Sequence, residues 1–337
     1  TATLSTISKV HRGSPLEIVD NVAVRAYPFV RNVIDKDGNS RKPLYGGEGG
    51  ALALNVWTPN PTTCVSDGKP ECTPRQVGTG GASSIVHAVI STGSAHTRGG
   101  GVSIGTGHAT MIQVDVYESH SLFGGSVGLH ERAKVVLLDS TFSHGRATVA
   151  LFGEEVSDDQ ACKRVGGYGG LFYFAEGVEV QHKALRLSDG IATRAGGGVA
   201  FGPSWMCLAY KNASAVHGRQ PKAIFVEKGD EGMNNASIIQ NCEVDPDLDI
   251  QSGGMSEMDL QSPELGGALY SLNGYDFQVG GMEITNCKAW RGGAMFVSMP
   301  AKAEVSRVIF HENDAREYGG ACEVEEGARL VLDHTLF

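Results

Sequence analysis

Acidic residues stand in short clusters whose spacing could hold a cation. Asp245, Asp247 and Asp249 occupy alternate positions, so their carboxylates would share one face of an extended segment and could bind calcium. Residues 35–39 (DKDGN) carry the alternating oxygens of a calcium loop, but Pro43 follows and the later bidentate glutamate is missing. A solvated loop and a hairpin turn explain the two clusters without a metal. The sequence therefore predicts no metal site and no cofactor.

Carboxylates set beside histidine or a basic side chain could also cleave polysaccharides, because glycosidases use two acids that flank the scissile bond. Only 333–334 (Asp-His) and 143–145 (Ser-His-Gly) approach such motifs. Asp158-Asp159 lies beside Glu154 and Glu155 in a polar stretch, where solvation explains the charges. The sequence favours a non-catalytic protein, and a polysaccharide lyase or glycoside hydrolase remains the alternative.

Two cysteines, Cys64 and Cys72, lie eight residues apart in a polar segment. Prolines surround them and prevent regular strand pairing, so we expect residues 57–80 to project as a loop; the prolines are Pro59, Pro61, Pro70 and Pro74. We predict a disulfide between the two cysteines, with two solvated thiols as the alternative. No Cys-x-x-Cys and no histidine stands nearby, which argues against zinc.

Cys242 and Cys287 each follow an asparagine in a similar local context. This similarity indicates a ladder of buried, small apolar side chains. The chain has seven cysteines, an odd number, so at least one thiol has no partner within it.

Asn212 and Asn235 each begin an Asn-Ala-Ser sequon in a turn-like context. We treat both as candidate N-glycosylation sites. Together with the expected disulfide, they favour an extracellular or cell-surface setting.

A repeated pair of glycines predicts the secondary-structure elements that would position these residues. Steps of 24, 26, 27 and 28 residues separate several copies, and steps of 45 and 51 are about two periods. The second glycines of the pairs are predicted to form structural corners: Gly50, Gly101, Gly125, Gly170, Gly198, Gly267, Gly293 and Gly320.

A second position keeps the same period. Seventeen residues after the second glycine stands a large apolar residue in five copies: Phe142, Leu187, Ile284, Phe310 and Phe337. We predict that this position lies in the core. Three residues further on we expect a second corner, because glycine and asparagine tolerate positive φ. The residues there are Gly145, Gly190, Cys287 and Asn313, with Asn286 one place early in the third copy.

Short apolar strands follow the doubled glycines, as in 268–271 (ALYS) and 294–297 (AMFV). We number the four residues after each glycine pair as places one to four. Glu323 stands at the third place of one copy, so side chains at the first and third places are expected to point outward and those at the second and fourth places inward. The other copies are apolar throughout, as strands covered on both faces are.

This arithmetic predicts an all-β, single-stranded parallel β-helix, a solenoid with about 25 residues per coil. One such domain spans 1–337, with projecting loops at 57–80, 152–168 and 227–265. Because Phe337 falls on a core position, we expect further coils after it and interpret the chain as a segment of a longer protein.

The net charge of −10 argues against nucleic acid as a partner. No stretch has 18 consecutive apolar residues, so we expect no membrane insertion of this segment.

One copy of the repeat is complete, with Phe310-His311-Glu312-Asn313 seven residues before Gly320-Ala321. This pairing of Phe-x-x-Asn with Gly-Gly-Ala resembles the repeat of the polymorphic outer membrane proteins of chlamydiae. The resemblance covers the repeats from about Gly49 onward. It implies a right-handed β-helix of the pectin-lyase-like type that is exposed at a cell surface and takes part in adhesion.

Repeats and resemblance together lead us to expect a non-catalytic, extracellular or cell-surface module with a structural or adhesive role in a larger filament or surface protein. The expected partners are copies of the same chain, other surface or filament proteins, and glycans.

Overall fold

The computed structural model describes fourteen ranges of the chain: 16–18, 22–23, 33–34, 40–41, 50–54, 82–95, 98–105, 107–130, 132–151, 164–202, 222–229, 237–245, 265–272 and 274–337. Within these ranges the regular elements are all strands, most of them in three parallel sheets. The prediction of an all-β chain with parallel strands is therefore confirmed.

The first sheet has twelve strands. They are β1 (Leu16–Ile18), β6 (Ala82–Ser91), β9 (Gly107–Tyr117), β12 (Ala133–Leu138), β13 (Thr141–Ser143), β18 (Glu179–Lys183), β19 (Arg186–Ser188), β22 (Ala223–Glu227), β23 (Ser237–Gln240), β26 (Phe277–Thr285), β29 (Lys302–His311) and β32 (Arg329–Asp333).

The second and third sheets have eight strands each. The second contains β2 (Val22–Ala23), β7 (Ser94–Ala95), β10 (His120–Ser121), β14 (Arg146–Ala147), β20 (Ile191–Ala192), β24 (Glu243–Val244), β27 (Lys288–Arg291) and β30 (Asp314–Tyr318). The third contains β5 (Leu52–Leu54), β8 (Val102–Ile104), β11 (Val127–Leu129), β17 (Phe172–Phe174), β21 (Val199–Phe201), β25 (Leu269–Ser271), β28 (Met295–Val297) and β31 (Cys322–Val324).

Two antiparallel pairs stand apart from the three sheets. They are β3 (Val33–Ile34) with β4 (Ser40–Arg41) and β15 (Val149–Leu151) with β16 (Arg164–Gly166).

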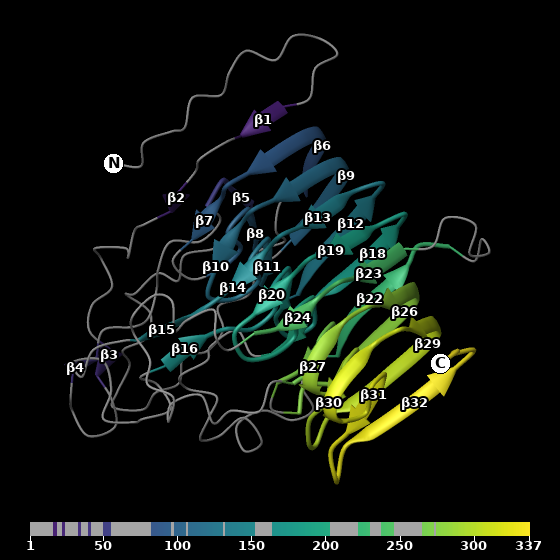
Figure 1. Cartoon of the computed structure of the whole chain (residues 1–337). Helices are drawn as coiled ribbons and strands as arrows, with labels where there is room; N and C mark the ends of the chain where they lie inside the picture. Colours follow the sequence, from purple (N-terminus) through teal and green to yellow (C-terminus); the bar gives the residue numbers. More distant parts are fainter. Residues whose placement is uncertain are drawn as a thin grey trace, which may run out of the picture.

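The chain visits the three sheets in a fixed order. It runs through β9 in the first sheet, β10 in the second and β11 in the third, and then returns to the first sheet at β12. We call one such passage a circuit. Each strand pairs in parallel with the equivalent strands of the circuits before and after it, so the strands stack along one axis (Figure 1).

The register is kept even where the number of residues between neighbouring strands changes. Lys302 pairs with Arg329, a step of 27 residues, whereas Arg146 pairs with Ile191, a step of 45. Extra residues are therefore accommodated between strands without displacing the next circuit.

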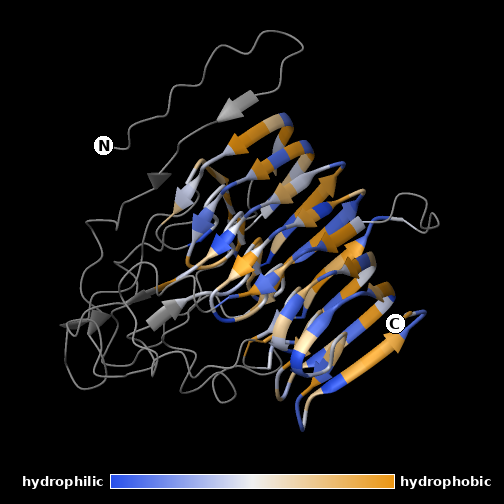
Figure 2. Ribbon diagram, viewed as in Figure 1, coloured by the Kyte–Doolittle hydropathy of each residue, from blue (hydrophilic) through white to orange (hydrophobic). Residues whose placement is uncertain are grey.

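A continuous apolar core lies between the sheets and is built mainly from residues of the first and third sheets, together with corner residues such as Cys242 and Cys287 just before second-sheet strands. Phenylalanine rings touch inside it within and between circuits: Phe142 and Phe172 of one circuit have centroids 4.7 Å apart, and Phe201 stacks on Phe277 of a later circuit at 4.5 Å. Figure 2 shows apolar residues gathered along the stacked strands with polar residues between them. Each fully buried ring contributes about 1.5–3 kcal/mol relative to exposure.

The six inner strands of the third sheet are buried on both faces, whereas β5 and β31 at its ends are partly exposed. At their second and fourth places residues such as Phe172 and Phe174 face the core, while the third-place Tyr173 joins a separate aromatic cluster on the outer side. The prediction for the first place is wrong, because Ala268 and Ala294 belong to the inner core. The chain is still turning the corner at that residue, so strict alternation begins one place later.

The first glycine of each doubled glycine has a left-handed backbone, with φ between 61° and 69° at seven levels: Gly99, Gly124, Gly169, Gly196, Gly266, Gly292 and Gly319. A Cβ on Gly124 would also lie 2.1 Å from the carbonyl oxygen of Val127. Glycine is needed at this corner for conformation and for space.

The second glycine is needed because circuits approach one another closely. A Cβ on Gly125 would lie 2.2 Å from the carbonyl oxygen of Gly170 in the next circuit. The same contact recurs along one column: Gly50, Gly100, Gly125, Gly170, Gly197, Gly267 and Gly293. Gly320 ends the column, but its Cβ would meet only the carbonyl oxygen of Asn313, at 3.1 Å.

Two of the predicted corner residues, Gly101 and Gly198, stand one residue past this column. Both end runs of three glycines, in which the sequence alone does not distinguish the two overlapping pairs. Gly101 instead donates its backbone N–H to Ser126 and occupies the place after the corner.

The second corner also differs from the prediction by one residue. Positive φ occurs at His144, Asp189, Asn286 and Glu312, each one residue before the predicted position. Gly145 and Gly190 are needed for space instead, since a Cβ would lie 2.4 Å and 2.3 Å from the carbonyl oxygens of Gly170 and Gly197.

The predicted core position forms one register column in the first sheet. Phe142 pairs with Leu187, and further along Ile284 pairs with Phe310; all four are buried. Phe337 is 67% exposed and stacks on Phe310 with ring centroids 5.1 Å apart. The column also contains residues that the seventeen-residue count missed: Ile90, Val116 and Ile239.

The predicted loops coincide only in part with breaks in the sheets. Residues 57–80 lie outside the described residues, as do 152–163 of the loop expected at 152–168. The range 227–265 is not one loop, because β23 and β24 fall within it and continue the first and second sheets. Strand β23 was not predicted from the sequence, because it has only four residues, Ser-Ile-Ile-Gln, and two of them are polar.

Candidate functional site

An open groove of about 550 Å³ runs along the corner between the first and second sheets. We call it the lateral groove. Its lining comes from four successive circuits and is mostly polar: His144, Arg146, Asp189, Ile191, Asn241, Cys242, Glu243, Asn286 and Lys288.

Corner geometry explains why these side chains point outward. The first residue of each corner has a left-handed backbone, with φ of 54° at His144, 56° at Asp189 and 53° at Asn286. The following residue faces inward, and the one after it, the first residue of the second-sheet strand, faces outward again. Each circuit thus supplies a corner side chain and a strand side chain to the groove.

The strand side chains are held in register. Arg146 pairs with Ile191, Ile191 with Glu243, and Glu243 with Lys288. Because paired strands lie about 4.8 Å apart, these four positions extend over roughly 14 Å. The groove therefore presents side-chain groups at regular intervals parallel to the stacking axis.

The corner and strand side chains differ in their existing contacts. Asn241 donates through Nδ2 to Oδ1 of Asp189 at 3.2 Å. Among the described residues, Arg146, Glu243 and Lys288 take part in no ion pair. These three charged groups are available to a ligand.

Two free, buried cysteines lie beneath the groove. Cys242 and Cys287 donate their thiols to the carbonyls two residues earlier, Gln240 at 3.4 Å and Thr285 at 3.3 Å. Burial and the neighbouring Cys287 raise the pKa of Cys242 well above its usual value. The predicted ladder of buried side chains is confirmed, because both cysteines are fully buried.

An exposed aromatic ring stands beside the groove. Trp290 follows Lys288 by two residues on the outward face of β27 and is 41% exposed. Its Nε1 donates to Glu317 at 2.9 Å, and the Arg316 guanidinium carbon lies 5.9 Å from the ring centroid. These contacts fix the orientation of the ring.

His182 was not singled out by sequence reasoning, and it lies fully buried in the first sheet. Its Nδ1 is 2.8 Å from Ser237 Oγ, which also accepts the backbone N–H of Leu185 at 3.0 Å. The Ser237 hydroxyl keeps its own O–H, so it can donate to Nδ1 of the neutral ring. Burial lowers the pKa of His182 to about 3, so the ring is neutral. Its inaccessibility indicates a structural role.

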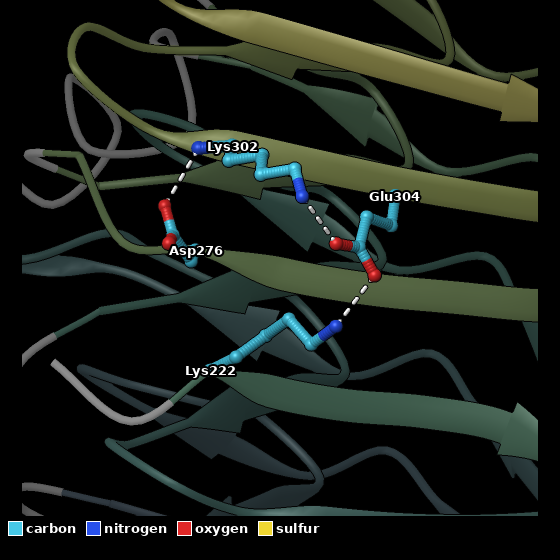
Figure 3. A network of polar contacts seen from close by, with 4 residues as sticks. All are labelled: Lys222, Asp276, Lys302 and Glu304. Atoms are coloured by element: carbon cyan, nitrogen blue, oxygen red, sulfur yellow. Dashed lines mark hydrogen bonds and ion pairs between the residues drawn. The ribbon is translucent and has the colours of Figure 1, made fainter. Parts of the chain in front are cut away.

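A second polar network crosses the outer face of the first sheet (Figure 3). Glu304 accepts from Lys222 at 2.5 Å and from Lys302 at 2.7 Å, and the Lys302 backbone N–H donates to Asp276 at 2.7 Å. The contact with Lys222, followed by that with Lys302, lowers the pKa of Glu304. These charges satisfy one another, so the network ties circuits together.

Most other predicted site residues lie outside the described residues: Cys64, Cys72, Asn212, Asn235, Asp247, Asp249, 35–39 and 158–159. Asp333 and His334 form an exposed pair at 2.7 Å. Within the described ranges, no three His, Cys, Asp or Glu side chains gather closely enough to hold a metal.

The lateral groove could have been found from one periodic signal. Its strand residues stand four places after the core column and its corner residues two places after it, as Arg146 and His144 do after Phe142. Sequence reasoning named His144 but not Arg146 or Glu243, because it searched for motifs contiguous in the chain.

In the part of the chain that the structure describes, no helix has the length and apolar character to cross a membrane. Comparison of the chain with protein-family models, with curated proteins and with solved structures gave no match.

Proposed function

We propose that the chain is a right-handed parallel β-helix that acts as a non-catalytic structural or adhesive module of a larger extracellular or cell-surface protein. The observation that carries this proposal is the shared register of three parallel sheets, with glycine columns at the corners. Connections between parallel strands of one sheet are right-handed in nearly all proteins, which supports the handedness.

A rigid rod follows from how the circuits are joined. Each circuit donates backbone hydrogen bonds to the next in all three sheets, and the apolar core is continuous along the axis. In such an array each repeat is stabilised chiefly by its neighbours, so the array can extend without a change of design. The lateral groove and the segments between strands then serve as surfaces for partners: copies of the chain, other filament or surface proteins, or glycans.

The experiment that tests this role combines assembly with turnover. The purified chain is incubated with acidic and neutral polysaccharides and assayed for new reducing ends and unsaturated products, while electron microscopy and light scattering follow self-association. The proposal expects no turnover and either fibre formation or retention on a cell surface. Turnover that a single Asp or Glu substitution abolishes would overturn it.

A polysaccharide lyase or hydrolase is the second candidate, because the lateral groove brings Asp189 and Glu243 together with Arg146 and His144. Paired carboxylates are the groups that glycosidic cleavage uses. For this candidate, Asp189→Asn and Glu243→Gln would each abolish product formation while leaving the unfolding transition unchanged.

A further inference from the structure

We propose that the lateral groove binds a linear neutral glycan, which lies along successive circuits and stacks one sugar ring on Trp290. This inference rests on the proposed function, because the rigid stacking of circuits sets the spacing of the groups that contact the ligand.

The groove offers hydrogen-bonding groups of both kinds. Asp189 and Glu243 only accept, Arg146 and Lys288 only donate, and the amide of Asn286 does both. A sugar hydroxyl is donor and acceptor at once, so it can satisfy each of these side chains. Arg146, Glu243 and Lys288 have no ion-pair partner among the described residues, so a ligand would not have to break existing ion pairs.

Charge selects a neutral ligand. The lining contains two acidic side chains, Asp189 and Glu243, and two basic ones, Arg146 and Lys288, so the formal charges of these four residues cancel. The whole chain carries −10, which disfavours the approach of a polyanion. A nucleic acid or an acidic polysaccharide would meet the carboxylates without a surplus of cations to bind it.

The form of the groove selects a polymer over a peptide. Its groups recur about every 4.8 Å along the axis, one circuit at a time, which suits a chain of similar units that each present hydroxyls. An extended peptide would need backbone partners for its N–H and C=O groups. The lining of the groove consists of side chains, and the strand edges beneath it are already paired.

Trp290 supplies the apolar surface that a sugar ring needs. Pyranose rings have faces of C–H bonds, and an indole ring packs against such a face over a large area. Glu317 and Arg316 already hold the ring, so little side-chain freedom is lost on binding. Lys288, two residues earlier on the same face, connects this platform to the groove.

Calorimetric titration of the whole chain tests the inference. The probes are linear neutral hexasaccharides of glucose, mannose, galactose and xylose, with polygalacturonate and heparin as acidic comparisons. We expect at least one neutral probe to bind. Trp290→Ala and Glu243→Gln should each weaken that binding by about tenfold or more, which corresponds to the loss of one good contact. Lys134→Ala, on the first sheet, should leave it unchanged.

Two results would overturn the inference. One is that no neutral probe binds at millimolar concentration; the other is that the variants in the groove and at Lys134 bind alike. Binding confined to the acidic polymers and lost in salt would also contradict it. The proposed function is tested separately, by assaying the same mixtures for glycan cleavage. Binding without cleavage supports both the glycan site and the non-catalytic function. Cleavage would contradict only the non-catalytic function.

Discussion

The carbonyl oxygen of Gly170 lies 2.2 Å from the point where a Cβ on Gly125 would stand. The two glycines are 45 residues apart in the chain, yet they are neighbours in one column that runs through the described circuits. Backbone from one circuit therefore occupies the space that a side chain of the previous circuit would need. This relationship explains why the doubled glycine is repeated and makes the packing of circuits testable by adding a single methyl group.

Gly125→Ala should destabilise the protein by about 1–3 kcal/mol or more, because the methyl group meets backbone atoms of Gly170 and Arg146 that cannot move independently. Gly320→Ala is the matched control: it stands in the same column, but its Cβ would meet only the Asn313 carbonyl oxygen, at 3.1 Å. Urea unfolding compares the two variants. Equal losses of stability would contradict the close stacking of Gly125 on Gly170.

Stability should fall as the pH decreases from about 6.5 toward about 3, through His182. Its folded pKa is lowered to about 3, so the unfolded chain binds the proton first and gains stability relative to the fold. Between pH 6.5 and pH 5 this amounts to about 2 kcal/mol. Urea unfolding of the wild type and His182→Gln at both pH values measures it. The wild type should lose more stability than the variant, and parallel losses would show that His182 is not buried neutral.

Glu304→Gln should lower stability by less than about 1 kcal/mol at neutral pH and low salt, because the ion pairs with Lys222 and Lys302 are partly exposed. The folded pKa of Glu304 is lowered, so its contribution is present above the unfolded pKa and disappears as the pH falls through the folded one. Unfolding curves at neutral and acidic pH should therefore converge for wild type and variant. A difference that persisted in acid or in strong salt would contradict this account of the network.

Cys242 and Cys287 should resist alkylation in the folded protein. Both are fully buried, so the reagent cannot reach either sulfur, and burial raises the pKa of Cys242, which disfavours its reactive thiolate. Mass spectrometry after brief iodoacetamide treatment should find both unmodified in native protein and modified after unfolding in urea. Rapid modification of either cysteine in the native state would place it at the surface of the groove.

The doubled glycines and the apolar residue at Phe142 and its equivalents predicted parallel strands because each has a local physical requirement, close backbone approach or burial. The precise corner could not be read from the sequence. Runs of three glycines fit two registers, which displaced Gly101 and Gly198 by one residue. Positive φ at Glu312 leaves no compositional trace, since glutamate is not typical of left-handed turns.

The candidate site was harder to predict than the fold. Arg146 and Glu243 are 97 residues apart and become neighbours only through Ile191, so no contiguous motif joins them. The seventeen-residue count did not find Ile239, because extra residues precede it in the chain. The groove position four residues later, Glu243, was therefore not found either. A search for polar residues at fixed offsets from a core column would have aligned them.

Spin-label distances along the first sheet test the central claim, the direct stacking of successive circuits, most directly. Labels attached through an introduced keto amino acid at Ser84 and Ser306 are separated by six strand steps, and labels at Val136 and Ser306 by four. At about 4.8 Å per step, the separations should be roughly 29 Å and 19 Å. A pair of distances that differ by about 10 Å in this order supports the account, and distances that do not increase with the number of circuits would contradict it.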